Sequence, residues 1–174
     1  MNDLLKKLQA FWSSRQEEVD KDYNRTLPFG DYVCDRWEKA RALGFGEGTS
    51  IYDSAHVFGP VTVGKNTWIG PFTILDGSGG LEIGSNCSIS AGVQIYSHDS
   101  VDWAISGGTE PYSKAPTRIG DNCYIGPNAV VAKGVTIGSG SIIGAGSLVL
   151  ESIPEGKRAF GVPCKVVGAS ITNS

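Results

Sequence analysis

Residues 117–150 read TRIGDNCYIGPNAVVAKGVTIGSGSIIGAGSLVL, and within them a branched aliphatic residue returns at every sixth position. These residues are Ile119, Ile125, Val131, Ile137, Ile143 and Val149. An α-helix has a period of about 3.6 residues and an ordinary strand a period of about 2, so neither gives a six-residue rule. A coil built of short straight faces does, because each face then contributes one large inward side chain. The stretch therefore predicts a β solenoid.

The same period extends toward the N-terminus as far as residue 51. It runs through Ile51, Val57, Val63, Ile69 and Leu75 and, after a two-residue slip around residues 77–80, through Ile83, Ile89 and Ile95. The next position is often glycine, and the position four residues on is mostly small, as expected where faces alternate with corners. We assign residues 1–46 to an N-terminal helical cap, 47–168 to the solenoid with a loop at 97–116, and 169–174 to a tail.

Length and composition limit the classes of function. The 174 residues, 40% of them hydrophobic, suffice for one globular domain, and a net charge of −3 indicates no partner among nucleic acids. No apolar run approaches the roughly 18 residues of a membrane-spanning helix, and the start lacks a secretion-signal pattern. The four cysteines show neither a CxxC pair nor metal-type spacing with histidine. We expect a cytoplasmic protein without a metal, its cysteines reduced and mostly buried, with a catalytic cysteine as the alternative.

The first 46 residues have helical rather than sixfold spacing. Leu4, Leu5, Leu8, Phe11 and Trp12 fall on one helical face. A second helix is predicted from Asp31 to Leu43, with Asp31 as its cap. A solenoid has open ends that need covering, and these helices are placed to cover the first coil. We expect the first helix to pack against its own domain or a sister subunit, and contact with a membrane surface is the alternative.

From residue 51 to about 168 the repeats resemble the (L/I/V)-G-x-x-(S/T/A/V)-x hexapeptides of the left-handed β-helix acyltransferases. The resemblance implies an all-β fold, a left-handed parallel β-helix with three hexapeptides to each triangular coil, here joined to a short N-terminal α-helical segment. It also implies a homotrimer in which each site uses two chains.

The repeat is lost at residues 97–116, which read SHDSVDWAISGGTEPYSKAP. A long irregular excursion from a regular scaffold is usually functional. Acyl transfer from a thioester needs a base, an oxyanion donor and two reactants held close together, and histidine suits the role of base because imidazole titrates near neutral pH. Residues 92–99, GVQIYSHD, resemble the segment that holds the catalytic histidine of maltose and galactoside O-acetyltransferases. That resemblance makes His98 the general base.

The same resemblance assigns a supporting carboxylate to the loop. It points to Glu110, which would fix the tautomer of His98, and Asp99 and Asp102 are rivals for this role. We expect Asp99, Trp103 and Tyr112 to contact the acceptor, with anchoring of the loop as the alternative for the two aromatic residues. The other histidine of the chain, His56, lies away from the loop and is interpreted as structural.

Residues 153–165, IPEGKRAFGVPCK, resemble the terminal segment of the same family, with its G-x-P-(A/C)-(K/R) ending. In that family coenzyme A lies along an outer groove between two subunits. Carried over by position, Gly126, Gly144 and Ala145 would line the pantetheine arm of acetyl-CoA, where small corners let backbone amides approach the arm. Lys165 would meet the phosphates, with residues 157 and 158 as further basic candidates.

These observations predict an acetyl-CoA-dependent O-acetyltransferase that acts on a sugar or a sugar-containing precursor. The Asn-x-Asn element of the maltose and galactoside enzymes is absent, since residues 69–71 read Ile-Gly-Pro, so the acceptor does not follow from the resemblance. Two alternatives stay open: an N-acetyltransferase of a nucleotide-linked amino sugar, and a non-catalytic binding solenoid. A γ-carbonic anhydrase type site needs three histidines around zinc, and the chain has two.

Overall fold

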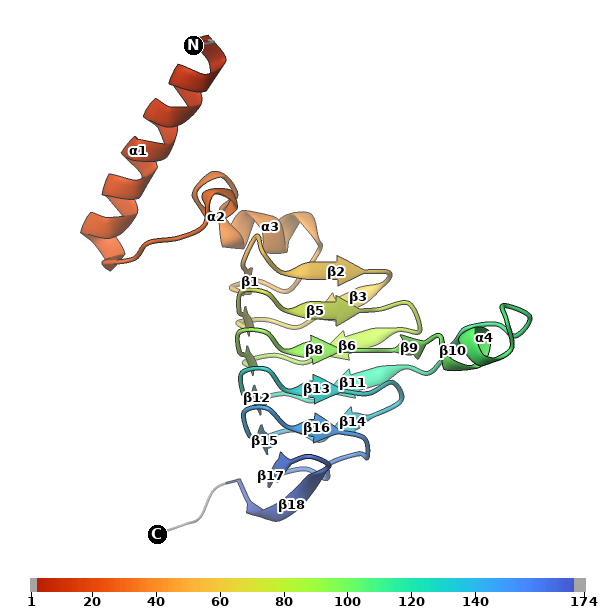
Figure 1. Ribbon diagram of the computed structural model, residues 1–174. Coiled ribbons are helices and arrows are strands. Elements are labelled where there is room, and N and C mark those ends of the chain that lie inside the picture. The colour runs from red at the N-terminus through yellow and green to blue at the C-terminus, as the bar shows by residue number, and fades with distance from the viewer. Residues whose placement is uncertain (1–2, 171–174) are drawn as a thin grey trace.

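The computed structural model describes residues 3–170 and shows a β solenoid with helices at its N-terminal end (Figure 1). Its coils are triangular, so the strands stack into three faces. The first face contains β1 (Ser50–Ile51), β4 (Trp68–Ile69), β7 (Ser88–Ile89), β12 (Tyr124–Ile125) and β15 (Ile142–Ile143). The second contains β2 (His56–Phe58), β5 (Ile74–Asp76), β8 (Gln94–Ile95), β13 (Val130–Val131) and β16 (Leu148–Val149). The third contains β3 (Val61–Val63), β6 (Leu81–Ile83), β11 (Thr117–Ile119) and β14 (Thr136–Ile137).

Each strand pairs in parallel with the strand one coil along, so equivalent residues of successive coils lie side by side. Ile69, for example, is in register with Ile51 on one side and Ile89 on the other. The chain passes from the first face to the second and then to the third, and Figure 1 shows that this winding is left-handed. The predicted fold is confirmed, including the hand, which runs against the general preference for right-handed crossovers.

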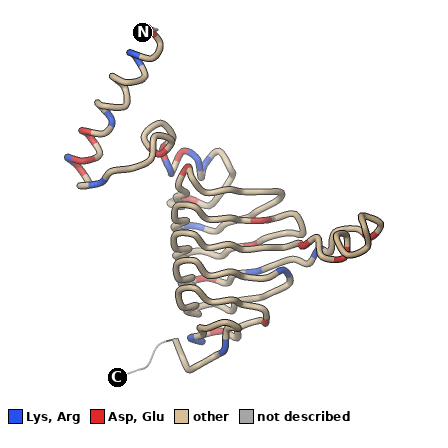
Figure 2. The backbone as a smooth tube through the Cα atoms, in the orientation of Figure 1, with Lys and Arg blue, Asp and Glu red and all other residues tan. Residues whose placement is uncertain are grey.

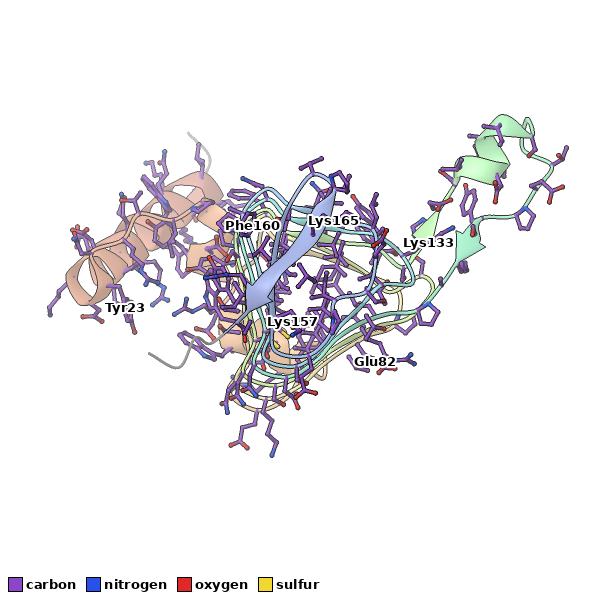
Figure 3. The ribbon with its side chains drawn as sticks, turned by 90° about the horizontal axis from the view of Figure 1, so that it is seen from below. Tyr23, Glu82, Lys133, Lys157, Phe160 and Lys165 are labelled. Atoms are coloured by element: carbon purple, nitrogen blue, oxygen red, sulfur yellow. The ribbon has the colours of Figure 1, made fainter. Side chains whose placement is uncertain are left out.

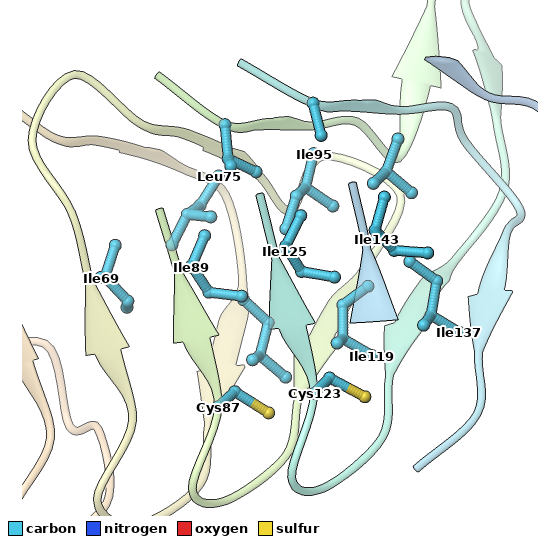
Figure 4. Close-up of a cluster of buried hydrophobic side chains, with 14 of the residues drawn as sticks. Ile69, Leu75, Cys87, Ile89, Ile95, Ile119, Cys123, Ile125, Ile137 and Ile143 are labelled. Carbon is cyan, nitrogen blue, oxygen red and sulfur yellow. The ribbon is translucent and has the colours of Figure 1, made fainter. Parts of the chain in front are cut away.

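The sixfold aliphatic residues form the core. All fourteen except Val57 are buried, and they stack in columns inside the prism (Figure 4). A fully buried isoleucine or leucine contributes roughly 1.5–3 kcal/mol, so these columns are the main source of stability. Cys87 and Cys123 stack in the same interior, Cys164 is also buried, and all four cysteines are free, as the sequence predicted.

We number the corners by the faces that they join. The first corner, between the first and second faces, holds residues 126–129 and 144–147; the second holds residues 76–80 and 96–116; the third holds residues 84–87 and 120–123. The third corner turns through left-handed backbone at Asn86 and Asn122, whose φ angles are 56° and 58°. Asparagine is among the few residues other than glycine that adopt this conformation routinely.

The predicted second helix is instead two short helices, α2 (Phe29–Val33) and α3 (Arg36–Ala42). Asp35, not Asp31, caps α3, and its carboxylate accepts from the amides of Trp37 at 2.9 Å and Glu38 at 3.0 Å. The Asp31 carboxylate accepts from the amide of Asp53 at 2.7 Å and so ties α2 to the first coil. The prediction of a single helix capped by Asp31 was wrong because the chain is extended at residues 34 and 35.

The helix α3 closes the open end of the solenoid. Its Lys39 Nζ donates to the backbone carbonyls of Tyr52, Asp53 and Ala55 at 3.0, 2.7 and 3.0 Å, which are corner carbonyls of the first coil. The first helix, α1 (Asp3–Tyr23), instead projects away from the coils (Figure 1), and Val19 is its one buried residue among those described. Neither α1 nor any other helix in residues 3–170 combines the length and hydropathy needed to span a bilayer.

The opposite end is closed by a hairpin of β17 (Lys157–Gly161) and β18 (Cys164–Ala169). β17 pairs in parallel with β15 and so extends the first face, and β18 then runs back antiparallel to it. Charged residues are sparse on the coils and gather in the N-terminal helices, the loop and this hairpin (Figure 2).

Candidate active site

The loop predicted at residues 97–116 leaves the solenoid at the second corner of the third coil. Its neck is a short antiparallel pair, β9 (His98–Asp99) with β10 (Ser113–Lys114), in which Asp99 lies opposite Ser113. A one-turn helix, α4 (Val101–Ile105), follows β9, and the loop projects well beyond the prism (Figures 1 and 3). His98 therefore lies at the base of the loop, where the loop meets the coils.

The imidazole of His98 rests against the carboxylate of Asp76. His98 Nδ1 lies 2.5 Å from Asp76 Oδ2, and the Asp76 side chain is 2% exposed against 31% for His98. A carboxylate oxygen only accepts, so this contact requires a hydrogen on Nδ1 and leaves the lone pair on Nε2. Nε2 is thus the ring nitrogen of His98 that can accept a proton.

Asp76 is held in the ionised state by a set of donors. Burial of its carboxyl is the largest single influence and opposes ionisation, but hydrogen bonds from Ser78, Ser97 and His98 together outweigh it. They keep the pKa of Asp76 well below its usual range. Asp76 Oδ2 accepts from the amides of Ser97 at 2.9 Å and His98 at 3.1 Å, and Asp76 Oδ1 from the amide of Ser78 at 3.0 Å.

The slip in the repeat is what places Asp76 there. The two extra residues belong to the turn 76–80, Asp-Gly-Ser-Gly-Gly, at the second corner directly before the coil that carries the loop. Gly79 donates its amide to Ser97 Oγ at 2.8 Å, and a Cβ at Gly79 would lie 2.2 Å from the carbonyl oxygen of Ser97. Sequence reasoning missed Asp76, although an irregularity one coil before a functional loop was a usable signal.

Glu110 does not occupy the supporting position that the sequence analysis gave it. The Nδ1 partner of His98 is Asp76, whereas Glu110 is exposed and lines a separate cavity of about 450 Å³ with Asp102 and Tyr112. The physical reason is local: residues 101–105 form α4, and the amide of Glu110 is bound by Ser106 Oγ at 2.9 Å, so the strand that returns to the neck begins only at residue 113.

The loop aromatics pack together beside His98. The Tyr112 ring lies 6.1 Å from the His98 ring and 5.7 Å from the Trp103 ring, edge to face with the latter at 81°. Both aromatics are exposed. The structure thus brings Trp103, Tyr112 and His98 into one cluster. This arrangement agrees with both roles predicted for the aromatic residues, which were contact with the acceptor and anchoring of the loop.

Asp99 is engaged by a residue that the sequence analysis did not single out. Its carboxylate lies 2.6 Å from Lys133 Nζ, and this contact together with the amide of Val101 lowers its pKa. Lys133, His98 and Asp99 line one cavity of about 520 Å³ below the loop. Its other lining residues are Tyr96, Ser100, Val101, Val130 and Ala132.

The predicted donor residues lie at a different corner. Gly126, Gly144 and Ala145 all occupy the first corner, in successive coils. A Cβ at Gly126 would lie 2.5 Å from the amide nitrogen of Ala145, and one at Gly144 would lie 2.7 Å from Cβ of Phe160. Coil stacking alone therefore explains these glycines, and their proximity to a ligand stays a prediction.

Lys165 lies on β18 opposite Phe160, and its ammonium is 3.6 Å from the carboxylate of Glu151. In the view along the solenoid axis, Lys165 falls between Phe160 at the first corner and Lys133 at the base of the loop (Figure 3). Within one chain, the width of the second face separates the first-corner residues from His98. Among the described residues, no group of three or more histidine, cysteine or carboxylate side chains could hold a metal ion.

Comparison with known proteins confirms the resemblance to hexapeptide-repeat proteins. Residues 116–151 match the family model of the bacterial transferase hexapeptide, and residues 60–97 match that of the hexapeptide repeat of succinyl-transferase. The fold and these two segments define the chain as a hexapeptide-repeat β-helix. Among curated proteins no match was found.

Solved structures of similar fold include three acyltransferases. AntD, an N-acyltransferase from Bacillus cereus crystallised with dTDP and 3-hydroxybutyryl-CoA, is 24% identical over 76% of this chain and 87% of its own, with a TM-score of 0.63. The acetyltransferase domain of PglB from Neisseria gonorrhoeae is 23% identical over 71% and 50%, with a TM-score of 0.57. The acetyltransferase VCA0836 from Vibrio cholerae is 21% identical over 95% and 94%, with a TM-score of 0.59. At such identities the likeness establishes the fold.

Proposed function

We propose that this chain is a cytoplasmic acetyl-CoA-dependent O-acetyltransferase that acts on a sugar or a sugar-containing precursor. The observation that carries the proposal is the His98–Asp76 pair. The Asp76 carboxylate fixes the tautomer of His98, and the pair lies where a loop leaves a hexapeptide-repeat solenoid. The matched repeat families and the CoA-bound structure of AntD, which shares the fold, support the same class of reaction.

In the proposed reaction the Asp76 carboxylate holds the Nδ1 hydrogen of His98 and stabilises the imidazolium that forms. Nε2 accepts the proton of the acceptor hydroxyl as that oxygen attacks the thioester carbonyl. The tetrahedral oxyanion is stabilised by a backbone amide of a neighbouring coil. When the C–S bond breaks, Nε2 returns the proton to the departing sulfur, so the base is regenerated and no covalent acyl-enzyme forms.

The donor would lie at the first corner of a second subunit. His98 and the residues Gly126, Gly144 and Ala145 occupy different corners of one chain, so a site that uses both needs two chains.

The outward residues of the second face are mostly apolar, including Ile74, Tyr96, Val130, Leu148 and Leu150, whereas those of the third face are Thr62, Glu82, Arg118 and Thr136. This contrast favours the second face over the third as a surface that a C3 homotrimer covers. Lys165 would meet the donor phosphates.

N-acetylation of a nucleotide-linked amino sugar is the second candidate. It is favoured by the cavity along the loop, where Asp102 and Glu110 present two carboxylates that can accept hydrogen bonds from an amino group. The N-acyltransferase AntD, bound to dTDP in its crystal structure, has a similar fold. A screen of matched hydroxy- and amino-sugar acceptors, with free thiol release as the readout, separates the two candidates.

Replacement of His98 by Ala tests the proposal. We expect kcat to fall by about 10²–10⁴-fold with the oligomeric state unchanged, because the general base is lost. The control is His56→Ala, which removes the other histidine, exposed on β2, and should keep near-normal turnover. Normal turnover in His98→Ala would refute the assignment of the base. Absence of coenzyme A binding by calorimetry would instead favour a non-catalytic solenoid.

A further inference from the structure

Lys133 joins the coil below the loop to both strands of the loop neck. It follows β13 at the second corner of the next coil, and Figure 3 shows it at the base of the loop. Its ammonium lies 2.6 Å from Asp99 Oδ2 on β9 and donates to Ser113 Oγ on β10. Asp99 and Ser113 face each other in register, so one side chain bridges the two strands at a single level.

The neck has few other ties to the solenoid. β9 and β10 are two residues long each, and a two-stranded hairpin of that size is not stable by itself. The amide of Ala115 donates to the carbonyl of Ser97 at 2.9 Å, and Asp76 binds the backbone of residues 97 and 98 from the coil above. Lys133 supplies the matching contact from the coil below, so the neck is held from both sides.

The contact also continues into the loop. The second oxygen of the Asp99 carboxylate, Oδ1, accepts from the amide of Val101 at 3.1 Å, at the start of α4. The Asp99 carboxylate therefore connects Lys133 to the first turn of α4, and so influences the direction in which the loop leaves the neck. The hydrogen bond with Lys133 is the first cause of the lowered pKa of Asp99, so this carboxylate stays charged to a lower pH than an unpaired one.

We propose that Lys133 is a positioning residue that fixes β9, and with it the His98 imidazole, in the geometry set by Asp76. The inference deepens the proposed function, since a kinetic effect requires that His98 is the base, but the clamp itself is independent of the reaction. The Lys133 side chain is 26% exposed and that of Asp99 38%. An ion pair this exposed contributes little to global stability, so its effect belongs to the local order of the neck.

Kinetics of Lys133→Met and Lys133→Arg test the inference. A displacement of a catalytic group by about 1 Å costs up to about 100-fold in rate, so we expect kcat of Lys133→Met to fall by roughly 10- to 100-fold with the KM for acetyl-CoA little changed. Lys133→Arg should keep most of the wild-type rate, because arginine retains the positive charge and the hydrogen-bond donors. Asp99→Asn should resemble Lys133→Met, and the double variant should be no worse than either single variant. Lys65→Met, at an exposed lysine of another corner, is the control.

Hydrogen exchange separates positioning from substrate contact. Lys133→Met should speed amide exchange across residues 98–114 and leave the coils protected, with or without substrate. Unchanged exchange with a raised KM would overturn the inference, because Lys133 would then contact a substrate. Full activity in Lys133→Met, when His98→Ala is inactive, would also overturn it while the proposed function stands. If the wild-type protein transfers no acyl group, the proposed function fails. Hydrogen exchange alone then shows whether Lys133 holds the neck in place.

Discussion

At the scale of single residues, the proposed site depends on one buried carboxylate. Asp76 accepts from three backbone amides besides the ring of His98. An asparagine at this position places an NH₂ group where a donor already points. We expect Asp76→Asn to lower kcat by about 10²-fold or more, because the tautomer is no longer fixed. An unmatched buried donor costs about 1–3 kcal/mol, so the variant should also be less stable.

The same variant gives a pH dependence of defined sign. The native pKa of Asp76 lies below the unfolded value of about 3.9, so ionised Asp76 stabilises the fold at pH values above about 4. This stabilisation is lost as the pH falls through the native value. The difference in melting temperature between wild type and Asp76→Asn, measured at one protein concentration, should therefore be greatest near neutral pH and shrink in acid. Asp121→Asn, which removes an exposed carboxylate that binds the amide of Ser85, is the control. A difference that stays constant between pH 3 and 7 would contradict the prediction.

At the scale of elements, the turn at residues 76–80 sets the position of the loop. A Cβ at Gly79 would lie 2.2 Å from a backbone carbonyl oxygen, that of Ser97, which a side-chain rotation cannot move. We expect Gly79→Ala to destabilise the protein by roughly 1–3 kcal/mol and to lower kcat, because residue 97 must shift and His98 follows it. Gly168→Ala, where the nearest atom is the end of the Arg158 side chain at 3.8 Å, should change neither thermal melting nor turnover. Wild-type stability and turnover in Gly79→Ala would contradict the prediction, because the turn would then accommodate the added Cβ.

Elements with a period were predictable from sequence, and elements decided by single contacts were not. The aliphatic residues fixed the register of every coil because only one phase buries them. The break between α2 and α3 was missed, although Asp35 followed by Glu38 is a helix-start pattern as good as Asp31. His98 was proposed as the base from the resemblance of residues 92–99, and that role stays a prediction. Asp76 was not identified, because it is distant in sequence and adjacent only through coil stacking.

At the scale of the whole molecule, the prism separates the two halves of the proposed site. His98 lies at the second corner and Ala145 at the first, with the second face between them. If a neighbouring subunit brings its first corner to this loop, two variants that are each inactive should complement one another. His98→Ala removes the proposed base, and Ala145→Trp places a large ring at the corner proposed to hold the donor, at an exposed position outside the core.

Mixtures of these two variants, assembled as the proposed trimer, give the last prediction. After random assembly from equal amounts, a site built from two chains combines an intact His98 with an intact Ala145 in about a quarter of cases. Activity should therefore recover to about a quarter of the wild-type value per site, whereas each variant alone stays inactive. Trimers mixed from wild type and Ala145→Trp calibrate the exchange, since half of their sites should be active. A site confined to one chain would show no recovery, because every subunit in the mixture carries one of the two defects.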